Sequence, residues 1–323
     1  MIANPQLSAN EPAMTYLTDN AHASRRLTDA VTASFSDIKL AHTVFALPFA
    51  VLGSVLATAR DGVSRGDLPG ILALVVLCMI FARTWAMLVN RIADRRFDAA
   101  NPRTAGRALA SGRVAVDQAG ALALASAAAF LACCFGYWFW FANPWPALLG
   151  VPTLAWIALY SFTKRFTWLS HVFLGGALAA SPLAAAIATR PGALADTPAL
   201  WWIAAMVLVW VAGFDALYAL QDLDFDRRAG LRSLPARFGW AGAVRASRAL
   251  HLGAVACLAL AWRAEPTLGG FFAIGVAAVA ALLALEHAVV ATRGLAGLPI
   301  AFFTVNGVVS VALGGLGVAD VLL

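Results

Sequence analysis

The sequence predicts an all-α integral membrane protein, with nine transmembrane helices in one bundle and the N-terminus in the cytoplasm. The composition is the first reason: 61% of the 323 residues are hydrophobic and 12% are charged, whereas a soluble domain carries roughly 25% charged residues. The second is a series of long apolar runs that do not alternate as membrane β-strands do. The third is that loops rich in Lys and Arg alternate along the chain with loops that hold few of them.

The chain divides into a tail and one membrane domain. Residues 1–34 are polar and lack the apolar core of a signal peptide, so we expect a disordered tail. Residues 35–323 hold the apolar runs, most of them close to the roughly 20 residues that span a bilayer. The runs are 41–59, 69–89, 119–141, 146–161, 171–189, 199–220, 243–262, 268–291 and 297–319.

The charge of the loops predicts the orientation. The tail and the loops after the second, fourth, sixth and eighth runs hold most Lys and Arg residues, and the opposite set holds only Arg60, Arg65, Arg190 and Arg263. The positive-inside rule places the richer set in the cytoplasm. Orientation in a bacterial-type inner membrane therefore explains the net charge of +6 without a nucleic-acid partner. The loops after the second and sixth runs are rich in Asp and Arg, so we expect any chemistry on the cytoplasmic side.

The first acidic motif is NRIADRRFD, at the end of the second run. Its Asn90, Asp94 and Asp98 are four residues apart, which places one amide and two carboxylates along one helix face. Arg83 precedes Asn90 by two helical turns on the same face and lies deeper in the membrane. An arginine at that depth usually has an anionic partner or a functional role.

The second acidic motif is DALYALQDLDFD, at the end of the sixth run. The spacing of Asp215, Asp222 and Asp226 again predicts one helix face, with Tyr218 between the first two. Asp224 is expected to point elsewhere. Asp215 lies inside an apolar run, where an unpaired carboxylate costs about 2.5 kcal/mol or more.

Two groups of carboxylates at one side of the membrane predict a magnesium site. Mg²⁺ is a hard cation that prefers carboxylate oxygens and completes its shell with water and substrate phosphate oxygens. Two facing acidic motifs could bind two such ions with a diphosphate between them. The alternative is a solvated loop of Asp–Arg pairs. The predicted ligands are Asn90, Asp94, Asp98, Asp215, Asp222 and Asp226.

Two further polar segments allow two interpretations each. In YSFTKRFT, Lys164 or Arg165 could bind a departing diphosphate and Tyr160 could line its site, or the segment is an ordinary positive loop. At the entry to the first run, Lys39 and His42 either bind an acidic aromatic substrate or lie at the lipid interface. Asn306 is polar at membrane depth, where most such residues make helix–helix hydrogen bonds. Glu286 and His287 are intramembrane ionisable residues to which the sequence assigns no role.

Together these residues resemble the UbiA superfamily of intramembrane prenyltransferases over roughly residues 35–320. The family motif N-x-x-x-D-x-x-x-D is matched from Asn90 to Asp98, and D-x-x-Y-A-x-x-D-x-x-x-D is matched from Asp215 to Asp226. The Tyr-x-x-x-Lys element is matched by Tyr160 and Lys164. Either acidic motif alone is a weak signal, whereas the set is specific.

The resemblance implies a Mg²⁺-dependent reaction between a polyprenyl diphosphate and an aromatic acid. The allylic C–O bond would ionise, and the carbocation would alkylate the ring, which then loses a proton. Arg91 follows Asn90 where many 4-hydroxybenzoate enzymes have Asp, and Ala108 and Ala110 depart from their R-P-L-P-S-G segment. The entry segment with His42 and Thr43, and the Asn90–Arg91 pair, resemble the branch linked to menaquinone made through futalosine. The resemblance therefore implies either 4-hydroxybenzoate or 1,4-dihydroxy-6-naphthoate as the acceptor.

Two other classes of protein are alternatives to the enzyme. A transporter could use intramembrane Asp and Arg residues as an ion path, but transporters often have internal repeats and midplane sites, and here the carboxylates gather at one side. A structural or assembly subunit gives no reason for two acidic motifs.

Overall fold

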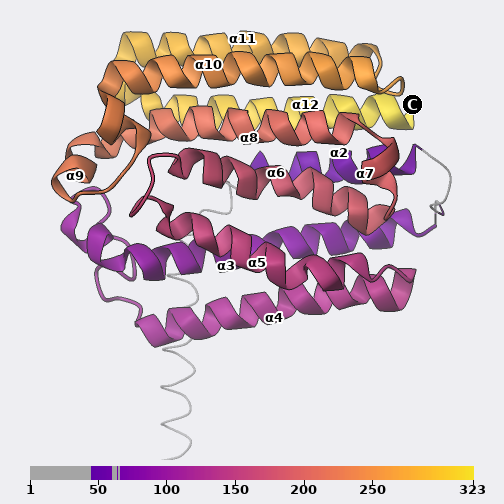
Figure 1. The fold of residues 1–323 in the computed structure, drawn as a ribbon, viewed down its shortest axis with the longest axis horizontal. Coiled ribbons are helices and arrows are strands. Elements are labelled where there is room, and N and C mark those ends of the chain that lie inside the picture. Colours follow the sequence, from indigo (N-terminus) through magenta and orange to yellow (C-terminus); the bar gives the residue numbers. More distant parts are fainter. Residues whose placement is uncertain (1–44, 60–63, 65) are drawn as a thin grey trace, which may run out of the picture.

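The computed structural model describes residues 45–59, 64 and 66–323, which form an elongated bundle of helices (Figure 1). The long helices are α2 (Leu47–Thr58), α3 (Leu68–Ala100), α4 (Val116–Phe141), α5 (Trp145–Thr163), α6 (Ser170–Thr189), α8 (Ala199–Tyr218), α10 (Leu234–Ala264), α11 (Gly270–Arg293) and α12 (Asn306–Leu322). The short elements are α7 (Ala193–Asp196), η2 (Ala219–Asp222), α9 (Leu223–Arg228), η3 (Gly294–Gly297) and the π-helix η4 (Ile300–Val305).

The prediction of an all-helical membrane protein is confirmed for the described residues, which contain no strand. Eight of their helical segments are long and apolar enough to cross a membrane. The first predicted run, 41–59, is seen as the 12-residue helix α2, and its beginning lies outside the described residues, as does the tail 1–34. The count of nine and the side of the N-terminus therefore stay predictions.

Several helices are longer than their apolar runs. Helix α3 continues past residue 89 to Ala100 and has 33 residues, about 50 Å at 1.5 Å per residue. Because the hydrocarbon core is about 30 Å thick, hydropathy alone marks only part of such a helix. Helix α5 has 19 residues, with Pro144 as its N-cap residue and Pro146 in its first turn. Prolines are well tolerated at the start of a helix, so these two are compatible with a helix that begins here.

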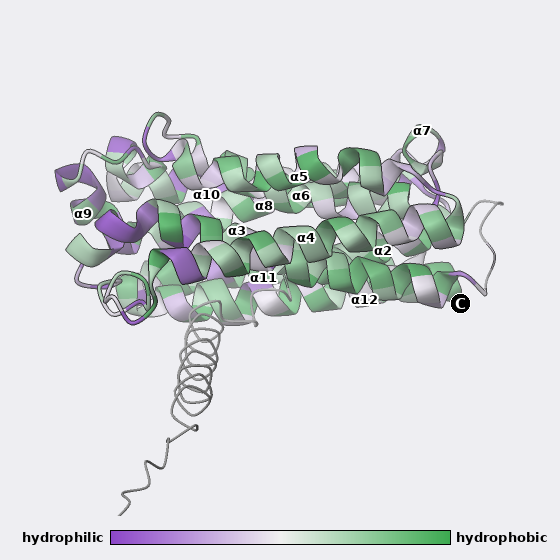
Figure 2. Cartoon of the chain, turned by 90° about the horizontal axis from the view of Figure 1, so that it is seen from below, coloured by the Kyte–Doolittle hydropathy of each residue, from purple (hydrophilic) through white to green (hydrophobic). Residues whose placement is uncertain are grey.

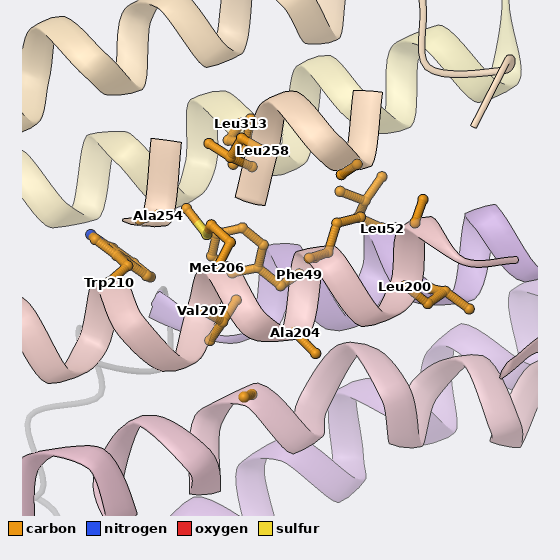
Figure 3. Close-up of a cluster of buried hydrophobic side chains, with 14 of the residues drawn as sticks. Phe49, Leu52, Leu200, Ala204, Met206, Val207, Trp210, Ala254, Leu258 and Leu313 are labelled. Carbon is orange, nitrogen blue, oxygen red and sulfur yellow. The ribbon is translucent and has the colours of Figure 1, made fainter. Parts of the chain in front are cut away.

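Helix α8 lies at the centre of the bundle. Its membrane-spanning window is 72% buried, against 28–44% for the other seven. Trp210 and Met206 of α8 pack with Phe49 of α2 and with Leu258 and Leu313 of the last helices (Figure 3). Close approach of α6 to α8 depends on a glycine, because a Cβ at Gly175 would lie 2.2 Å from the Leu208 carbonyl oxygen.

The outer surface has two parts. Large apolar side chains such as Leu124, Phe139 and Leu252 are more than two-thirds exposed along the length of the bundle, as expected of residues that face lipid tails. Polar residues gather at the end of the bundle that carries α9 (Figure 2). The last turns of α3 and the end of α8 reach this same end (Figure 1), which brings the two acidic motifs together.

Candidate active site

Both acidic motifs line one polar cavity of about 240 Å³ at this end. Asn90, Asp94 and Asp98 enter it from α3, as the four-residue spacing predicts for a continuous helix. The second motif reaches it across a change of helix type: Asp215 lies on α8, Asp222 in the 3₁₀ turn η2 and Asp226 on α9. The expected single helix face is therefore wrong for this motif, although all three carboxylates reach the cavity.

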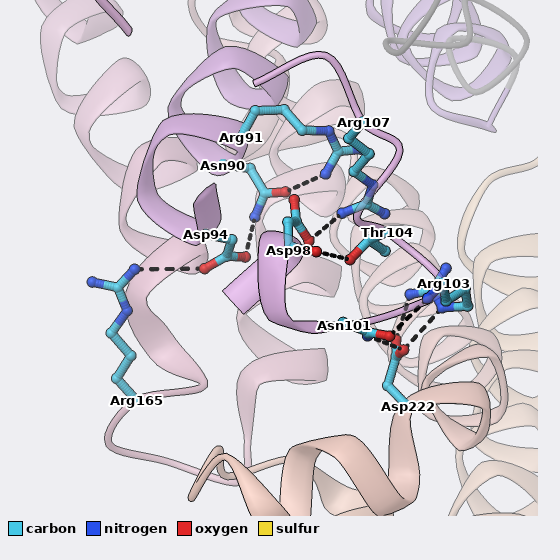
Figure 4. A network of polar contacts seen from close by, with 10 residues as sticks. All are labelled: Asn90, Arg91, Asp94, Asp98, Asn101, Arg103, Thr104, Arg107, Arg165 and Asp222. Atoms are coloured by element: carbon cyan, nitrogen blue, oxygen red, sulfur yellow. Dashed lines mark hydrogen bonds and ion pairs between the residues drawn. The ribbon is translucent and has the colours of Figure 1, made fainter. Parts of the chain in front are cut away.

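The carboxylates of the first motif are paired with arginines (Figure 4). The guanidinium of Arg107 donates to Asp98 Oδ1 at 2.7 Å, and Arg165 Nη2 lies 3.5 Å from Asp94 Oδ1. The Asn90 amide donates to Asp94 Oδ2 at 3.1 Å. These contacts orient the side chains and offset the repulsion between neighbouring negative charges.

Asp222 has the most complete set of partners in the second motif. Arg103 Nε and Nη2 donate to its two oxygens at 2.9 and 2.5 Å, and the Asn101 amide donates to Oδ1 at 2.8 Å. Burial alone would lower the pKa of Arg103, but the bonds to Asp222 outweigh it and raise that pKa above its ordinary value. Arg103 and Arg107 belong to the loop after α3, so this loop folds over both motifs (Figure 4).

Asp215 is paired with a residue that sequence reasoning missed. The His171 ring, 1% exposed at the start of α6, places Nδ1 2.6 Å from Asp215 Oδ2. Its other nitrogen, Nε2, accepts a hydrogen bond from the Leu234 backbone N–H at 3.3 Å. The proton of a neutral ring is therefore assigned to Nδ1, which donates to the carboxylate. The only sequence signal was a histidine at the polar start of an apolar run.

Lys164 lies among the carboxylates of the polar cavity. Burial would lower its pKa, but the negative charges of Asp226, Asp215 and Asp222 outweigh burial and raise the pKa above its ordinary value. Lys164 is thus a cation at neutral pH. Asp226 is 2% exposed, and its Oδ2 has no hydrogen-bond partner.

A second, apolar cavity of about 560 Å³ lies deeper in the bundle, lined by α2, α3, α4, α5, α6, α8 and η4. Arg83 lines this cavity and not the polar one, and its Nε has no hydrogen-bond partner. Four residues line both cavities, and we call them the collar: Met87, Tyr160, Leu174 and Phe302. Tyr218 lines the polar cavity and packs against the collar, with its ring centroid 4.1 Å from that of Phe302.

The other residues predicted from the sequence line neither cavity or lie outside the residues that the structure describes. Arg165 does not line either cavity, although it reaches Asp94 and donates to the Ala93 carbonyl at 2.6 Å. Asp224 is exposed and outside the polar cavity, in line with its expected direction. Lys39 and His42 lie outside the described residues.

Arg103 and Arg107, which line the polar cavity, were not predicted as site residues. They appear in the sequence only as loop charges, and nothing local indicates their partners.

The donor set of the polar cavity fits a hard divalent cation. Five aspartates line the cavity, against three arginines and one lysine, and the buried Asp226 Oδ2 is unsatisfied. Among the described residues, no three His, Cys, Asp or Glu side chains converge closely enough to bind one ion by themselves. This suits Mg²⁺, which commonly takes one or two protein carboxylates and fills its shell with water and phosphate oxygens.

Comparisons with known proteins agree with this architecture. The model of the UbiA prenyltransferase family matches residues 46–308. A 4-hydroxybenzoate octaprenyltransferase of Chromohalobacter salexigens is 33% identical over 230 residues, which cover 69% of this chain and 72% of that protein. The apo structure of a UbiA homolog from Aeropyrum pernix K1 is 33% identical with a TM-score of 0.76, covering 88% of this chain and 99% of that one.

A more distant structure shares the fold. A UbiA homolog from Archaeoglobus fulgidus, bound to GPP and Mg²⁺, has a TM-score of 0.66 at 18% identity and covers 90% of this chain and 100% of that one. The family match and the 33% identical relative confirm that the protein is an enzyme, and not the transporter or assembly subunit considered from the sequence. The chain is a membrane prenyltransferase that belongs to the UbiA prenyltransferase family.

Proposed function

We propose that the protein transfers a polyprenyl chain from its diphosphate to an aromatic acid that is a quinone precursor, in a Mg²⁺-dependent reaction at the cytoplasmic side of a bacterial inner membrane. The observation that carries this proposal is the pair of cavities that share the collar. A polar cavity rich in carboxylates suits a metal-bound diphosphate, and the apolar cavity suits a hydrocarbon chain.

The charge of the polar cavity supports a divalent cation. A diphosphate placed among five aspartates, with only four cationic side chains to offset them, would meet strong repulsion. Mg²⁺, when bound, would neutralise the diphosphate and make it a better leaving group. The proposed ligands are Asn90, Asp94, Asp98, Asp215, Asp222 and Asp226.

The chain's own residues would orient the donor and hold the leaving group. Lys164 remains cationic because the carboxylates raise its pKa, so it can bind the diphosphate as the allylic C–O bond breaks and the electron pair leaves with oxygen. A ring carbon of the acceptor then supplies the electron pair of the new C–C bond, and the ring loses a proton. The apolar cavity keeps water from the hydrocarbon.

Arg83 is the proposed partner of the acceptor carboxylate. It precedes the collar residue Met87 by four positions on α3, which is about one helical turn, or 5.4 Å. A carboxylate on Arg83 would therefore place an aromatic ring near the collar. The unpartnered Nε of Arg83 in an apolar wall supports an anionic ligand. Lys39 and His42, outside the described residues, stay predicted contributors to acceptor binding.

Two acceptors are candidates. The Chromohalobacter relative is named a 4-hydroxybenzoate octaprenyltransferase, which supports 4-hydroxybenzoate. Arg91, Ala108 and Ala110 depart from the pattern of many such enzymes, which argues against this acceptor. The Asn90–Arg91 pair and the His42–Thr43 segment resemble the other branch, which supports 1,4-dihydroxy-6-naphthoate. The Archaeoglobus homolog bound to GPP and Mg²⁺ supports the donor class and the metal.

The test is a transfer assay with purified protein, Mg²⁺ and a polyprenyl diphosphate, offering the two acceptors in parallel. We expect one acceptor to be prenylated, and we expect EDTA to stop the reaction. Asp94→Ala and Asp222→Ala should each remove most activity while the protein remains inserted, whereas Asp224→Ala, on the exposed neighbour, should not. Near-normal turnover in both motif variants would refute the metal assignment.

A further inference from the structure

The collar is where the reacting carbon must lie if the proposed function holds. The diphosphate would occupy the polar cavity and the hydrocarbon the apolar one, so the C–O bond between them has to pass the residues that line both. Of the four collar residues, Met87 and Leu174 are aliphatic, and only Tyr160 and Phe302 have an aromatic ring.

The ring of Phe302 is held by other aromatic rings. Its centroid lies 4.1 Å from that of Tyr218, 4.8 Å from that of Phe303, 5.2 Å from that of Phe214 and 5.7 Å from that of Phe45. The Arg103 guanidinium, already paired with Asp222, lies 5.8 Å from the Tyr218 ring. Phe302 is thus connected through Tyr218 to the carboxylates of the polar cavity while its own ring borders the apolar one.

The backbone that carries Phe302 has an unusual form. It belongs to the π-helix Ile300–Val305, which precedes α12, and single π-turns often occur at functional sites. Asn306, fully buried at the end of this turn, donates from Nδ2 to the Ala301 carbonyl at 2.9 Å and to Glu286 Oε1 at 3.3 Å. The turn is therefore tied through a side chain and not only by its own backbone.

Asn306 also joins the turn to the central helix. Its Oδ1 accepts a 2.7 Å hydrogen bond from Trp210 Nε1 on α8, and Trp210 packs in the main core (Figure 3). Glu286 and His251, both at most 3% exposed, continue this polar cluster into α11 and α10, with 3.9 Å between His251 Nδ1 and Glu286 Oε2. Buried polar residues within a membrane bundle fix helices relative to one another.

We propose that Phe302 is a catalytic residue whose ring stabilises positive charge on the allylic carbon and closes the collar against water, and that Asn306 is the residue that positions it. This inference rests on the proposed function. As the C–O electron pair leaves with diphosphate, the carbon gains positive charge, and the face of an aromatic ring attracts a cation. Without that ring, water can donate an electron pair to the carbon and lose a proton, which gives a prenyl alcohol in place of the prenylated acid.

The experiment measures kcat, the KM for the diphosphate and the ratio of prenyl alcohol to prenylated acid. Phe302→Leu removes the aromatic face and Phe302→Tyr keeps it. Phe272→Leu is the matched control, because Phe272 is a fully buried aromatic that lines neither cavity. Cation–π energies correspond to about 2- to 30-fold in rate. We expect Phe302→Leu to lower kcat within that range, raise the alcohol share and leave the KM for the diphosphate unchanged, with Phe302→Tyr close to wild type.

Two outcomes would overturn the role of Phe302: wild-type kcat and alcohol share in Phe302→Leu, or equal losses in Phe272→Leu. Should Phe302→Leu fail to insert, Phe302→Met removes the same aromatic face with a flexible side chain. A wild-type protein that prenylates no aromatic acid with Mg²⁺ present would instead refute the proposed function itself.

Asn306→Leu tests the positioning role. It should raise the alcohol share as Phe302→Leu does, and the double variant should be no worse than the worse single one, since both act on the same ring. A lower melting temperature with an unchanged alcohol share would reduce Asn306 to a structural residue and overturn its positioning role.

Discussion

Asp226 is the site residue whose neutralisation should stabilise the protein and stop its reaction at the same time. The side chain is 2% exposed and its Oδ2 has no hydrogen-bond partner, whereas Asp98 and Asp222 are paired with arginines. An ionised carboxylate that is buried and incompletely hydrogen-bonded is costly, because it has lost its hydration. Asp226→Asn removes this charge and keeps the shape, while the loss of its attraction to Lys164 offsets part of the gain. We therefore expect a net gain of about 1 kcal/mol in the free energy of unfolding without Mg²⁺, or roughly 2 °C in melting temperature.

The same change removes a proposed magnesium ligand. Loss of one group that stabilises the charge of a transition state costs on the order of 100-fold in rate, and we expect at least this loss of prenyl transfer. We also expect the Mg²⁺ concentration for half-maximal activity to rise.

The assay combines thermal unfolding in detergent with EDTA and a Mg²⁺ titration of transfer. Asp224→Asn is the control, because it makes the same charge change two positions away, on an exposed residue outside the polar cavity, and both measurements should match wild type. A lower melting temperature in Asp226→Asn than in wild type, or undiminished transfer, would show that this carboxylate is a satisfied structural group.

Three other changes test neighbouring parts of the site. Lys164→Met should raise the KM for the diphosphate about tenfold, by loss of roughly 1.4 kcal/mol of charge-assisted binding. The pKa of Lys164 is raised in the folded protein. Its charge and the stability it contributes are therefore fully present below about pH 10.4, the ordinary pKa of lysine, and are lost only as the pH rises through the higher pKa of the folded state. A wild-type KM for the diphosphate that climbs between pH 7 and 9 would contradict this. Arg83→Met should raise the acceptor KM and leave the diphosphate KM unchanged, and equal changes in both constants would argue against a carboxylate partner. Arg103→Lys keeps the charge but not the two parallel hydrogen bonds to Asp222. We expect the melting temperature to fall by roughly 2 °C. An unchanged melting temperature would show that this partly exposed ion pair contributes little to stability.

Sequence reasoning located the membrane bundle and the acidic motifs because both depend on local patterns. Hydropathy marks the lipid-embedded part of a helix, and the four-residue spacing of Asn90, Asp94 and Asp98 places them on one face of a continuous helix. The same logic was wrong for the second motif, since the chain tightens into a 3₁₀ turn after Tyr218. Spacing alone cannot distinguish a long helix from two short ones joined by a turn.

The partners of the carboxylates could not be predicted, because they are contacts between segments far apart in the chain. His171 reaches Asp215 across 44 positions and Arg103 reaches Asp222 across 119. A sequence shows that a buried carboxylate needs a partner, but not which of many basic residues supplies it. The π-helix that carries Phe302 is equally hidden, because its sequence IAFFTV is an ordinary apolar run.

These pairings also bear on how the proposed Mg²⁺ would bind. Arg103 and Arg107 each neutralise one carboxylate, Asp222 in the second motif and Asp98 in the first. A cation that binds these oxygens must displace or share the arginines, and its apparent affinity is lowered by the energy of the pairs it replaces. A diphosphate that arrives with the cation can accept the released guanidinium groups, since they bind phosphate as well as carboxylate. If the proposed function holds, we therefore expect the loop after α3 to favour joint binding of metal and donor over binding of the metal alone.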